Sequence, residues 1–261
     1  MERLTKALLR QTKALQQRKT RTETQYFSVE GSKGIKELLK ANSPFQCRYI
    51  VTANDVFPEL YHGIRIYETT RKEMEQMSSM QSPPDAIAVF EQIHFPPPDK
   101  TSPPPNTIIC LDKIQDPGNL GSIIRTAAWF GIRHIVCSKD TVSLYNPKVV
   151  RSTMGALAQV EVSYTELAPW LKKCKNDYLI CVLDTSGEDL WACQDLNTHP
   201  TIFVLGNEGQ GISDDVAKLS HRTLTIPSHS TTPVESLNVA SAAAITIAFR
   251  THLQKPHHNS L

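Results

Sequence analysis

The stretch TIFVLGNEGQGIS, residues 201–213, places three glycines and a carboxylate directly after a short apolar run. Glycines at 206, 209 and 211 would let the backbone approach a ligand closely, because no Cβ stands in the way. Glu208 would repel a phosphate, so the loop suits a ligand with a cationic or hydrogen-bond-donating part. The glycine spacing matches neither the dinucleotide fingerprint nor the Walker phosphate loop. Taken alone, the stretch also fits a plain turn from a strand into a helix that starts at Ser213.

A second segment, DPGNLGSIIRTAAWFG at 116–131, has the pattern of a helix with a polar start. Asn119 is predicted to cap this helix. Gly121 and Arg125 are four residues apart, so we expect them on the same exposed face, with open space beside the guanidinium. An anionic backbone would fit there. A surface ion pair is the alternative interpretation of Arg125.

The third segment is IPSHSTTPVESLNVASAAAI, residues 226–245. Pro227 ends a strand, and a polar loop leads to a helix predicted from Ser236 to about Leu253. Small residues fill the helix interior, and its free N–H groups would favour a carboxylate at the positive end. A well-packed alanine helix explains the alanines but not the Ser-Leu-Asn before them.

The elements that must position these segments are short and rich in β-branched residues. Strands are predicted at 107–112, 134–138, 158–162, 178–184, 201–206 and 222–227, with helices between them. This alternation predicts an α/β domain with a mainly parallel sheet and helices on both faces, whose ligands bind beyond the carboxyl ends of the strands. The segment before it predicts a smaller N-terminal α/β unit.

Six of the chain's 17 prolines lie in FPPPDKTSPPPN, residues 95–106. Consecutive prolines favour a stiff, extended spacer. We therefore expect an N-terminal domain at 1–94, a linker at 95–106, a C-terminal domain at 107–254 and a tail at 255–261.

Composition narrows the class of protein. The 261 residues are 40% hydrophobic and 21% charged, as in an ordinary globular protein, and no apolar run is long enough for a membrane span. The N-terminus lacks the apolar core of a secretory signal. Six scattered cysteines at no zinc spacing indicate a reduced, cytoplasmic protein without a metal site.

The charge of the first 25 residues is uneven, with seven Lys or Arg against two acids. Such a cluster indicates either contact with an anionic partner, of which nucleic acid is the commonest, or a solvated helix face. The residues predicted to contact RNA are Arg10, Lys13, Arg18, Lys19 and Arg21.

Together, N-L-G-x-x-x-R, L-G-N-E-G-x-G and I-P-…-V-E-S-L-N-V-x-x-A resemble, in order and spacing, the three signature motifs of the SpoU/TrmH-type RNA 2′-O-ribose methyltransferases of the SPOUT superfamily. The segment KALLRQTKALQQRKTRTETQYFSVEGSKGIKELL is similar to the start of the substrate-binding domain of rRNA-directed members. The resemblance implies a deep trefoil knot, a homodimer, and S-adenosylmethionine as the cofactor.

The resemblance also implies the roles of individual residues. Loops at 184–187, 205–211 and 226–238 would hold the cofactor. Residues 228–233 depart from the family pattern, because the loop is longer here and contains no glycine. The cofactor-binding residues implied are Thr185, Leu205, Gly206, Gly211, Ile226 and Leu237. The catalytic residues implied are Asn119, Arg125, Glu208, Ser236 and Asn238. Because a guanidinium keeps its proton in proteins, Arg125 is expected to position phosphate and hydroxyl more than to act as the base.

The leading prediction is therefore methyl transfer to a ribose 2′-hydroxyl of RNA. Ribosomal RNA is favoured by the separate N-terminal domain and its basic helix. Transfer RNA is the alternative substrate, and an RNA-binding protein without catalysis on the same fold is the alternative function. A dinucleotide enzyme is disfavoured by the missing fingerprint.

Overall fold

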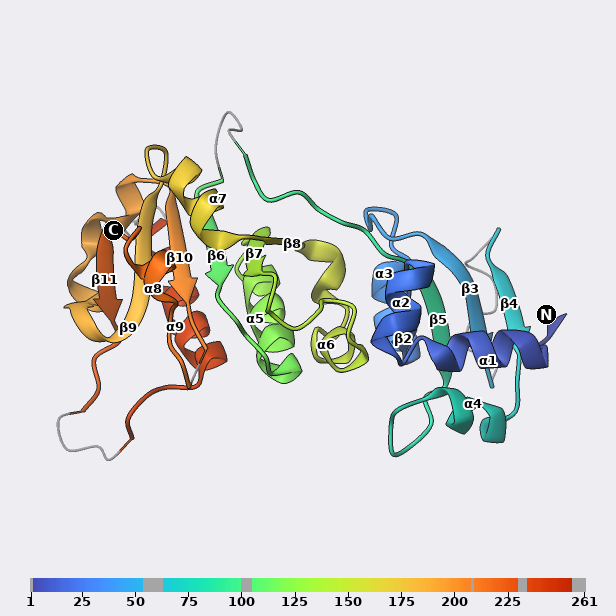
Figure 1. Ribbon diagram of the computed structural model, residues 1–261. Helices are drawn as coiled ribbons and strands as arrows, with labels where there is room; N and C mark the ends of the chain where they lie inside the picture. The colour runs from blue at the N-terminus through green and yellow to red at the C-terminus, as the bar shows by residue number, and fades with distance from the viewer. Residues whose placement is uncertain (1, 54–62, 100–104, 208, 230–233, 255–261) are drawn as a thin grey trace, which may run out of the picture. The chain divides into compact units, whose positions relative to one another are not determined.

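The computed structural model describes residues 2–53, 63–99, 105–207, 209–229 and 234–254 (Figure 1). The chain divides into two compact units. The first comprises Met1–Ile93 together with Ser143–Gln159, and the second comprises His94–Val142 together with Val160–Leu261. No helix within the described ranges is long and apolar enough to cross a membrane.

The first unit is built on a mixed sheet with strand order β1-β4-β3-β5-β2. The strands are β1 (Glu2–Arg3), β2 (Tyr26–Glu30), β3 (Cys47–Thr52), β4 (Arg65–Glu68) and β5 (Ala86–Glu91). The helices are α1 (Lys6–Ala14), α2 (Arg18–Thr24), α3 (Ser32–Leu38) and α4 (Arg71–Met77). Apolar side chains of α1, α4, β3 and β5 share one core. The predicted small α/β unit is thus confirmed.

A segment from the second half of the chain, Ser143–Gln159, packs within this first unit. It contains α6 (Pro147–Ser152) and a 3-10 turn, Ala156–Gln159. The Tyr145 hydroxyl donates to the carbonyl of Ile93 at 2.6 Å and accepts from its N–H at 2.8 Å. The Tyr145 ring lies 4.6 Å from the ring of Phe27, centroid to centroid. Burial raises the pKa of Tyr145 to about 12, so this phenol stays a neutral donor.

The second unit holds a parallel sheet with strand order β11-β9-β10-β6-β7-β8. The strands are β6 (Thr107–Leu111), β7 (His134–Ser138), β8 (Glu161–Thr165), β9 (Leu179–Asp189), β10 (Thr201–Leu205) and β11 (Arg222–Thr225). The helices are α5 (Pro117–Trp129), α7 (Leu167–Cys174), α8 (Asp214–Ala217) and α9 (Val239–Gln254), with short 3-10 turns at Leu190–Ala192 and Gln194–Thr198. The predicted parallel α/β fold is confirmed. The trefoil knot stays a prediction.

Both faces of this sheet are covered, as expected for a parallel sheet. Every residue of β6 and β10 is buried. Alternate residues such as Ile108 and Ile202 pack with Trp170 of α7 in one core. The intervening residues point to the opposite face, and α5 and α9 pack against each other (Figure 1).

Three local predictions were wrong. Strand β8 begins three residues later than predicted, because Ala156–Gln159 winds into a 3-10 turn. Helix α5 begins at Pro117 and is capped by Asp116, whose carboxylate accepts from the N–H of Asn119, so Asn119 lies inside the first turn and is not the cap. Gly121 is buried rather than exposed beside Arg125.

The last helix also begins later than predicted, at Val239 rather than Ser236. The side-chain oxygen of Asn238 accepts from the N–H of Ala240 at 3.0 Å and of Ser241 at 3.3 Å, which is the geometry of a helix cap. The helix therefore starts where an asparagine satisfies its free amides. The residues 236–238 form the end of the preceding loop.

Near its other end, α9 is anchored by a buried arginine. Arg250 is 1% exposed. Its guanidinium donates to the hydroxyl of Thr107 at 3.2 Å and to the carbonyls of Asn106 and His199 at 3.1 and 2.9 Å. These partners lie at the start of β6 and just before β10, so Arg250 fixes α9 to the amino ends of the two central strands.

Candidate active site

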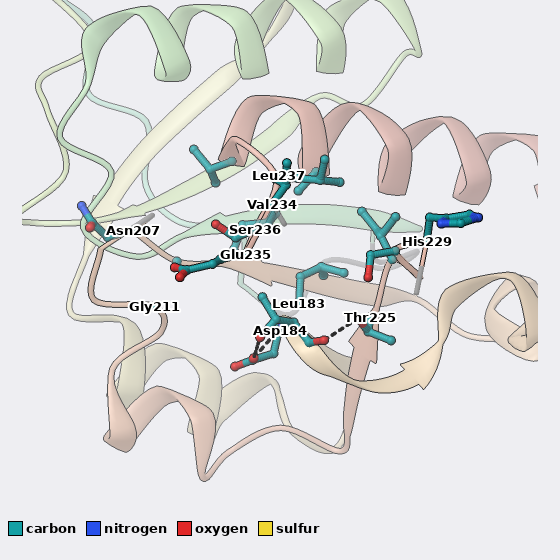
Figure 2. A pocket seen from close by; sticks show the side chains of 17 residues that line it. Leu183, Asp184, Asn207, Gly211, Thr225, His229, Val234, Glu235, Ser236 and Leu237 are labelled. Carbon is teal, nitrogen blue, oxygen red and sulfur yellow. Dashed lines mark hydrogen bonds between the residues drawn. The ribbon is translucent and has the colours of Figure 1, made fainter. Parts of the chain in front are cut away.

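A cavity of about 550 Å³ lies in the second unit, beyond the last residues that pair β9 with β10. Three segments of the chain form it, and Figure 2 shows residues 234–237 on one side with Asp184 and Thr225 on the other. Its lining consists of Leu183, Asp184, Thr185, Leu205, Gly206, Asn207, Gly211, Thr225, Ile226, Ser228, His229, Val234, Glu235, Ser236, Leu237, Val239 and Ala242. The cavity thus sits at the carboxyl edge of the sheet, where ligands of parallel sheets bind.

All six residues predicted to bind a cofactor lie in this lining, together with Ser236. They come from three segments that are separated in sequence: the second half of β9, the residues that follow β10 and the residues that follow β11. The structure thereby brings the second and third motifs together with residues 183–185, which lie outside the three motifs. Glu208 and residues 230–233 lie outside the described residues.

The loop after β10 is folded tightly on itself. Asn207 and Gly211 exchange two backbone hydrogen bonds, of 3.1 and 2.8 Å. The Asn207 side-chain oxygen also accepts from the N–H groups of Gly209 and Gln210, at 2.8 and 3.2 Å. A Cβ on Gly206 would lie 2.3 Å from the carbonyl oxygen of Gly211. Glycine at 206 is therefore required by the close approach of two backbone segments.

The backbone in the second half of β9 is held by the carboxylate of Asp184. An oxygen of Asp184 accepts from the N–H of Thr185 at 2.6 Å and from that of Ser186 at 3.4 Å. The Thr225 hydroxyl donates to the carbonyl of Thr185 at 3.1 Å (Figure 2). The N–H and the carbonyl of Thr185 are therefore both held by hydrogen bonds, which fix their orientation at the cavity wall.

The charge of the cavity is negative. Asp184 and Glu235 contribute carboxylates, and the described lining contains neither lysine nor arginine. A ligand with a positive charge is favoured there by simple electrostatics. This agrees with the preference for a cationic ligand predicted from the glycine loop.

Sequence reasoning did not single out six polar lining residues, namely Asp184, Asn207, Thr225, Ser228, His229 and Glu235. Three of them had a usable signal. Asp184 ends a predicted strand, Asn207 follows one, and Glu235 directly precedes the Ser-Leu-Asn of the third motif. Polar residues at carboxyl strand ends are the ones a parallel sheet presents to a ligand.

The first and third motifs meet outside the cavity lining. The Asn238 amide donates to the side-chain oxygen of Asn119 at 3.0 Å. Since Asn238 also caps α9, this single side chain links the start of α9 to the first turn of α5. Two of the residues predicted to be catalytic are thus in direct contact.

Arg125 is exposed on α5, six residues after Asn119. Within the described part of the chain, no hydrogen bond or ion pair is recorded for its guanidinium. The surface ion pair that was the alternative interpretation is therefore not seen among these residues. The guanidinium is available for an anion.

The basic residues of the first unit divide into two kinds. Arg10, Lys13, Arg18 and Lys19 are exposed. Arg21 is only 5% exposed, and its guanidinium donates to the carbonyls of Leu15 and Gln16, each at 2.9 Å. Arg21 therefore caps the carboxyl end of α1, and we correct its predicted role from RNA contact to helix termination.

The pairing of β9 with β11, which carries Thr185 and Thr225, is braced by Arg222. Its guanidinium contacts Glu188 at 2.5 Å and Asp195 at 3.0 Å. Hydrogen bonds from Arg222 lower the pKa of Glu188 and the pKa of Asp195 below their ordinary values of 4.5 and 3.8. The charged forms of both carboxylates are thus favoured in the folded state.

A pH dependence of stability follows from these lowered pKa values. Their stabilisation is present above the ordinary values and is lost as the pH falls through the lower, folded-state values. Arg222→Gln should therefore cost about 1 kcal/mol near pH 6, because both carboxylates are more than half exposed, and should cost little near pH 3. Urea unfolding of both proteins at several pH values measures this. A difference that stays constant down to pH 3 would contradict the assignment, and Lys139→Gln, which removes an exposed pair with Glu166, is the control.

Comparison with known proteins places these observations in a family. The model of the SpoU rRNA methylase family matches residues 106–248, a span that contains the three motifs and the whole described cavity lining. The chain belongs to the SpoU rRNA methylase family. A second model, that of the MRM3-like substrate binding domain, matches residues 6–88. The family resemblance predicted for both parts of the sequence is confirmed.

Relatives of this SpoU-family chain match over most of their length. A tRNA/rRNA methyltransferase of Synechocystis is 30% identical, over 92% of this chain and 89% of the relative. The 23S rRNA (guanosine(2553)-2′-O)-methyltransferase of Bacillus subtilis is 28% identical, over 90% and 92%. Among solved structures, a TrmH-family RNA methyltransferase from Porphyromonas gingivalis has a TM-score of 0.83 at 32% identity, covering 95% of this chain and 98% of that one. The AdoMet-bound rRNA methyltransferase from Sinorhizobium meliloti has a TM-score of 0.80 at 25% identity, covering 97% of each.

Within the described residues, no group of three or more His, Cys, Asp or Glu side chains is arranged to hold a metal ion.

Proposed function

We propose that this SpoU-family protein transfers a methyl group from S-adenosylmethionine to a ribose 2′-hydroxyl of RNA, with ribosomal RNA as the substrate. One observation carries the proposal: residues 183–185 of β9 and the segments after β10 and β11 converge on a single cavity, whose third-motif segment is linked to the first-motif helix through Asn238 and Asn119. The residues implied by three separate motifs thus form one neighbourhood.

The chemistry of the cavity suits S-adenosylmethionine. A volume of about 550 Å³ is ample for a nucleoside with an amino-acid tail, and the backbone of Leu205, Gly206 and Ile226 offers hydrogen-bonding groups to a base. The carboxylates of Asp184 and Glu235 favour a ligand that carries a sulfonium and an ammonium. The relative from Sinorhizobium meliloti, which binds AdoMet, supports this assignment.

When bound, the cofactor supplies an activated methyl group, so the protein has to position the acceptor. Arg125 is exposed and, among the described residues, unpaired, and we assign to it the RNA phosphate next to the reacting ribose. Asn119 and Asn238 hold the first turn of α5 against the start of α9, which fixes where Arg125 stands relative to the loops. Glu208 and Ser236 are the further polar groups that we place at the reacting end.

Ribosomal RNA is favoured over transfer RNA by the first unit. The MRM3-like substrate binding domain matches residues 6–88, and the relative from Bacillus subtilis methylates 23S rRNA. We also propose that the chain forms a homodimer through the exposed side of α5. Trp129 is 83% exposed there, one turn beyond Arg125, and a large exposed aromatic residue favours an interface.

The proposed function is tested by mapping ribose methylation in total RNA from cells with and without the gene. Loss of a 2′-O-methyl group in ribosomal RNA, restored by the gene in trans, is the expected result. Loss of a 2′-O-methyl group in transfer RNA would instead identify transfer RNA as the substrate. If no ribose methylation changes although the purified protein binds S-adenosylmethionine, the proposed 2′-O-methylation is contradicted. The alternative of an RNA-binding protein without catalysis is then favoured.

A charge variant tests the RNA-contacting surface of the first unit. Changing Arg10, Lys13, Arg18 and Lys19 together to glutamine should weaken RNA binding at least tenfold and flatten its salt dependence, because each lost phosphate contact removes about 0.7–0.9 from the logarithmic slope. Filter binding over a salt series measures both. Lys172→Gln with Lys173→Gln, exposed on α7 of the second unit, is the matched control. An unchanged slope in the quadruple variant would refute this surface.

A further inference from the structure

A buried carboxylate directly follows β6 and faces a segment 101 residues away in sequence. Asp112 is 2% exposed. Its Oδ2 accepts from the N–H of Ser213 at 2.8 Å and from the Ser213 hydroxyl at 2.6 Å. No ion pair to a described lysine, arginine or histidine accompanies it. A buried charge is costly unless hydrogen bonds compensate it, so these two bonds are the strong, charge-assisted kind.

The same short segment also holds the other end of the glycine loop. The N–H of Asp112 donates to the carbonyl of Leu205 at 2.9 Å. The carbonyl of Lys113 accepts from the side-chain amide of Asn207 at 3.0 Å. Residues 112 and 113 therefore contact the loop at its first residue, near its bend and at its last residue, Ser213.

Residues 112–114 are themselves held from the far side. The N–H of Lys113 donates to the hydroxyl of Ser138 at 2.8 Å, and the N–H of Ile114 donates to that of Thr141 at 3.2 Å. Lys113 has a left-handed backbone, with φ of 57°, which fits a tight and fully bonded turn. The turn is a fixed support rather than a flexible connection, and it leads directly into α5.

We propose that Asp112 is a positioning residue for the cofactor: it clamps the 205–213 loop through Ser213 and so sets the shape of the cavity wall. This inference rests on the proposed function, since the ligand of that wall is S-adenosylmethionine. Asp112 does not line the cavity, so its effect on the ligand passes through the loop. If the hydrogen bonds between Asp112 and Ser213 are lost, the backbone segments at Gly206 and Gly211 move apart. The expected consequence is weaker binding of the cofactor.

The test measures S-adenosylmethionine binding by calorimetry and steady-state kinetics on the full-length chain. Asp112→Asn should raise the Kd and the KM for S-adenosylmethionine at least tenfold, because it removes the negative acceptor of two hydrogen bonds. The kcat at saturating cofactor and the KM for RNA should change less than threefold. Ser213→Ala should raise the same Kd several-fold, and Ser213→Thr, which keeps the hydroxyl, should restore most of the affinity.

A matched control separates positioning from general stability. Ser163→Ala removes a serine hydroxyl from β8 that is more deeply buried than that of Ser213, being 2% exposed and bonded to the carbonyl of Ile135, away from the cavity. It should lower the melting temperature without changing the Kd. If Ser213→Ala likewise changes only the melting temperature, the proposal is overturned, whether or not Asp112→Asn folds. If the wild-type chain itself does not bind S-adenosylmethionine, the proposed function fails first, and the two failures are thereby distinguished.

Discussion

Alanine at position 206 should abolish cofactor binding, with the Kd for S-adenosylmethionine raised at least about a hundredfold. The Cβ of this alanine would lie 2.3 Å from the carbonyl oxygen of Gly211, 2.4 Å from its carbon and 2.6 Å from the nitrogen of Ile212. All three atoms belong to the backbone, so no side-chain rotation relieves the contact. The loop would have to open, and its two backbone hydrogen bonds between Asn207 and Gly211 would break.

The matched control for this change lies three residues further along. Among the described residues, a Cβ on Gly209 would meet the side-chain oxygen of Asn207 alone, at 3.4 Å, so Gly209→Ala should leave the Kd within a few-fold of the wild type. Calorimetric titration with S-adenosylmethionine gives both values, and a melting curve reports whether each variant is folded. Equal affinities for the two alanine variants would show that the loop is only a turn.

Alanine at position 125 should have the largest effect on turnover, lowering kcat at least about a thousandfold while the Kd for S-adenosylmethionine stays the same. Arg125 is exposed and does not line the cavity, so its removal leaves the cofactor wall intact. It is expected to act on the RNA, as a charged fork for phosphate, and such positioning groups contribute several kcal/mol to a transition state. Arg125→Lys keeps the charge but loses the fork, and should recover only part of the rate.

Single-turnover methyl transfer, measured with bound radiolabelled cofactor, isolates this effect from binding. Arg133→Ala is the appropriate comparison, because this exposed arginine lies shortly after α5 and contacts Glu161. Its rate should match the wild type. Normal single-turnover rates in Arg125→Ala would remove Arg125 from the reaction and leave the first motif with a structural role.

The sequence was sufficient for the existence and order of the strands of the second unit and for the edge at which the cavity lies, although β8 begins three residues later than predicted and β9 continues to Asp189 rather than ending at 184. Runs such as TIICL and TIFVL are continuous and apolar because both faces of β6 and β10 are buried, which a single sequence displays directly. Once the sheet is parallel, all strand ends of one kind meet, so loops far apart in sequence must share a site. The glycine-bearing segments around Gly187 and Gly206 could be expected at one edge on that ground, whereas the cofactor roles of Thr185 and Leu205 came from the family resemblance.

Other features depend on contacts that no local pattern encodes. Arg21 sits in a run of exposed cations, and only the folded chain shows its guanidinium turned back to the carbonyl groups at the end of α1. The bond between Asp112 and Ser213 spans 101 residues. The capping residue of α5 could have been predicted from the local sequence. Pro117 fits the first position of a helix, which makes Asp116, and not Asn119, the cap.

The segment Ser143–Gln159 limits how freely the two parts of this protein can be exchanged for those of a relative during evolution. It belongs to the span matched by the methylase family, yet it packs in the unit that also contains the substrate binding domain. If the chain were divided at the proline-rich segment, by recombination or in a truncated protein, Tyr145, Val149 and Val150 would therefore lose the surface that buries them. The substrate-binding module is not freely exchangeable: a new one must either reproduce the surface around Phe27 and Ile93 or arrive together with changes in these 17 residues of the methylase.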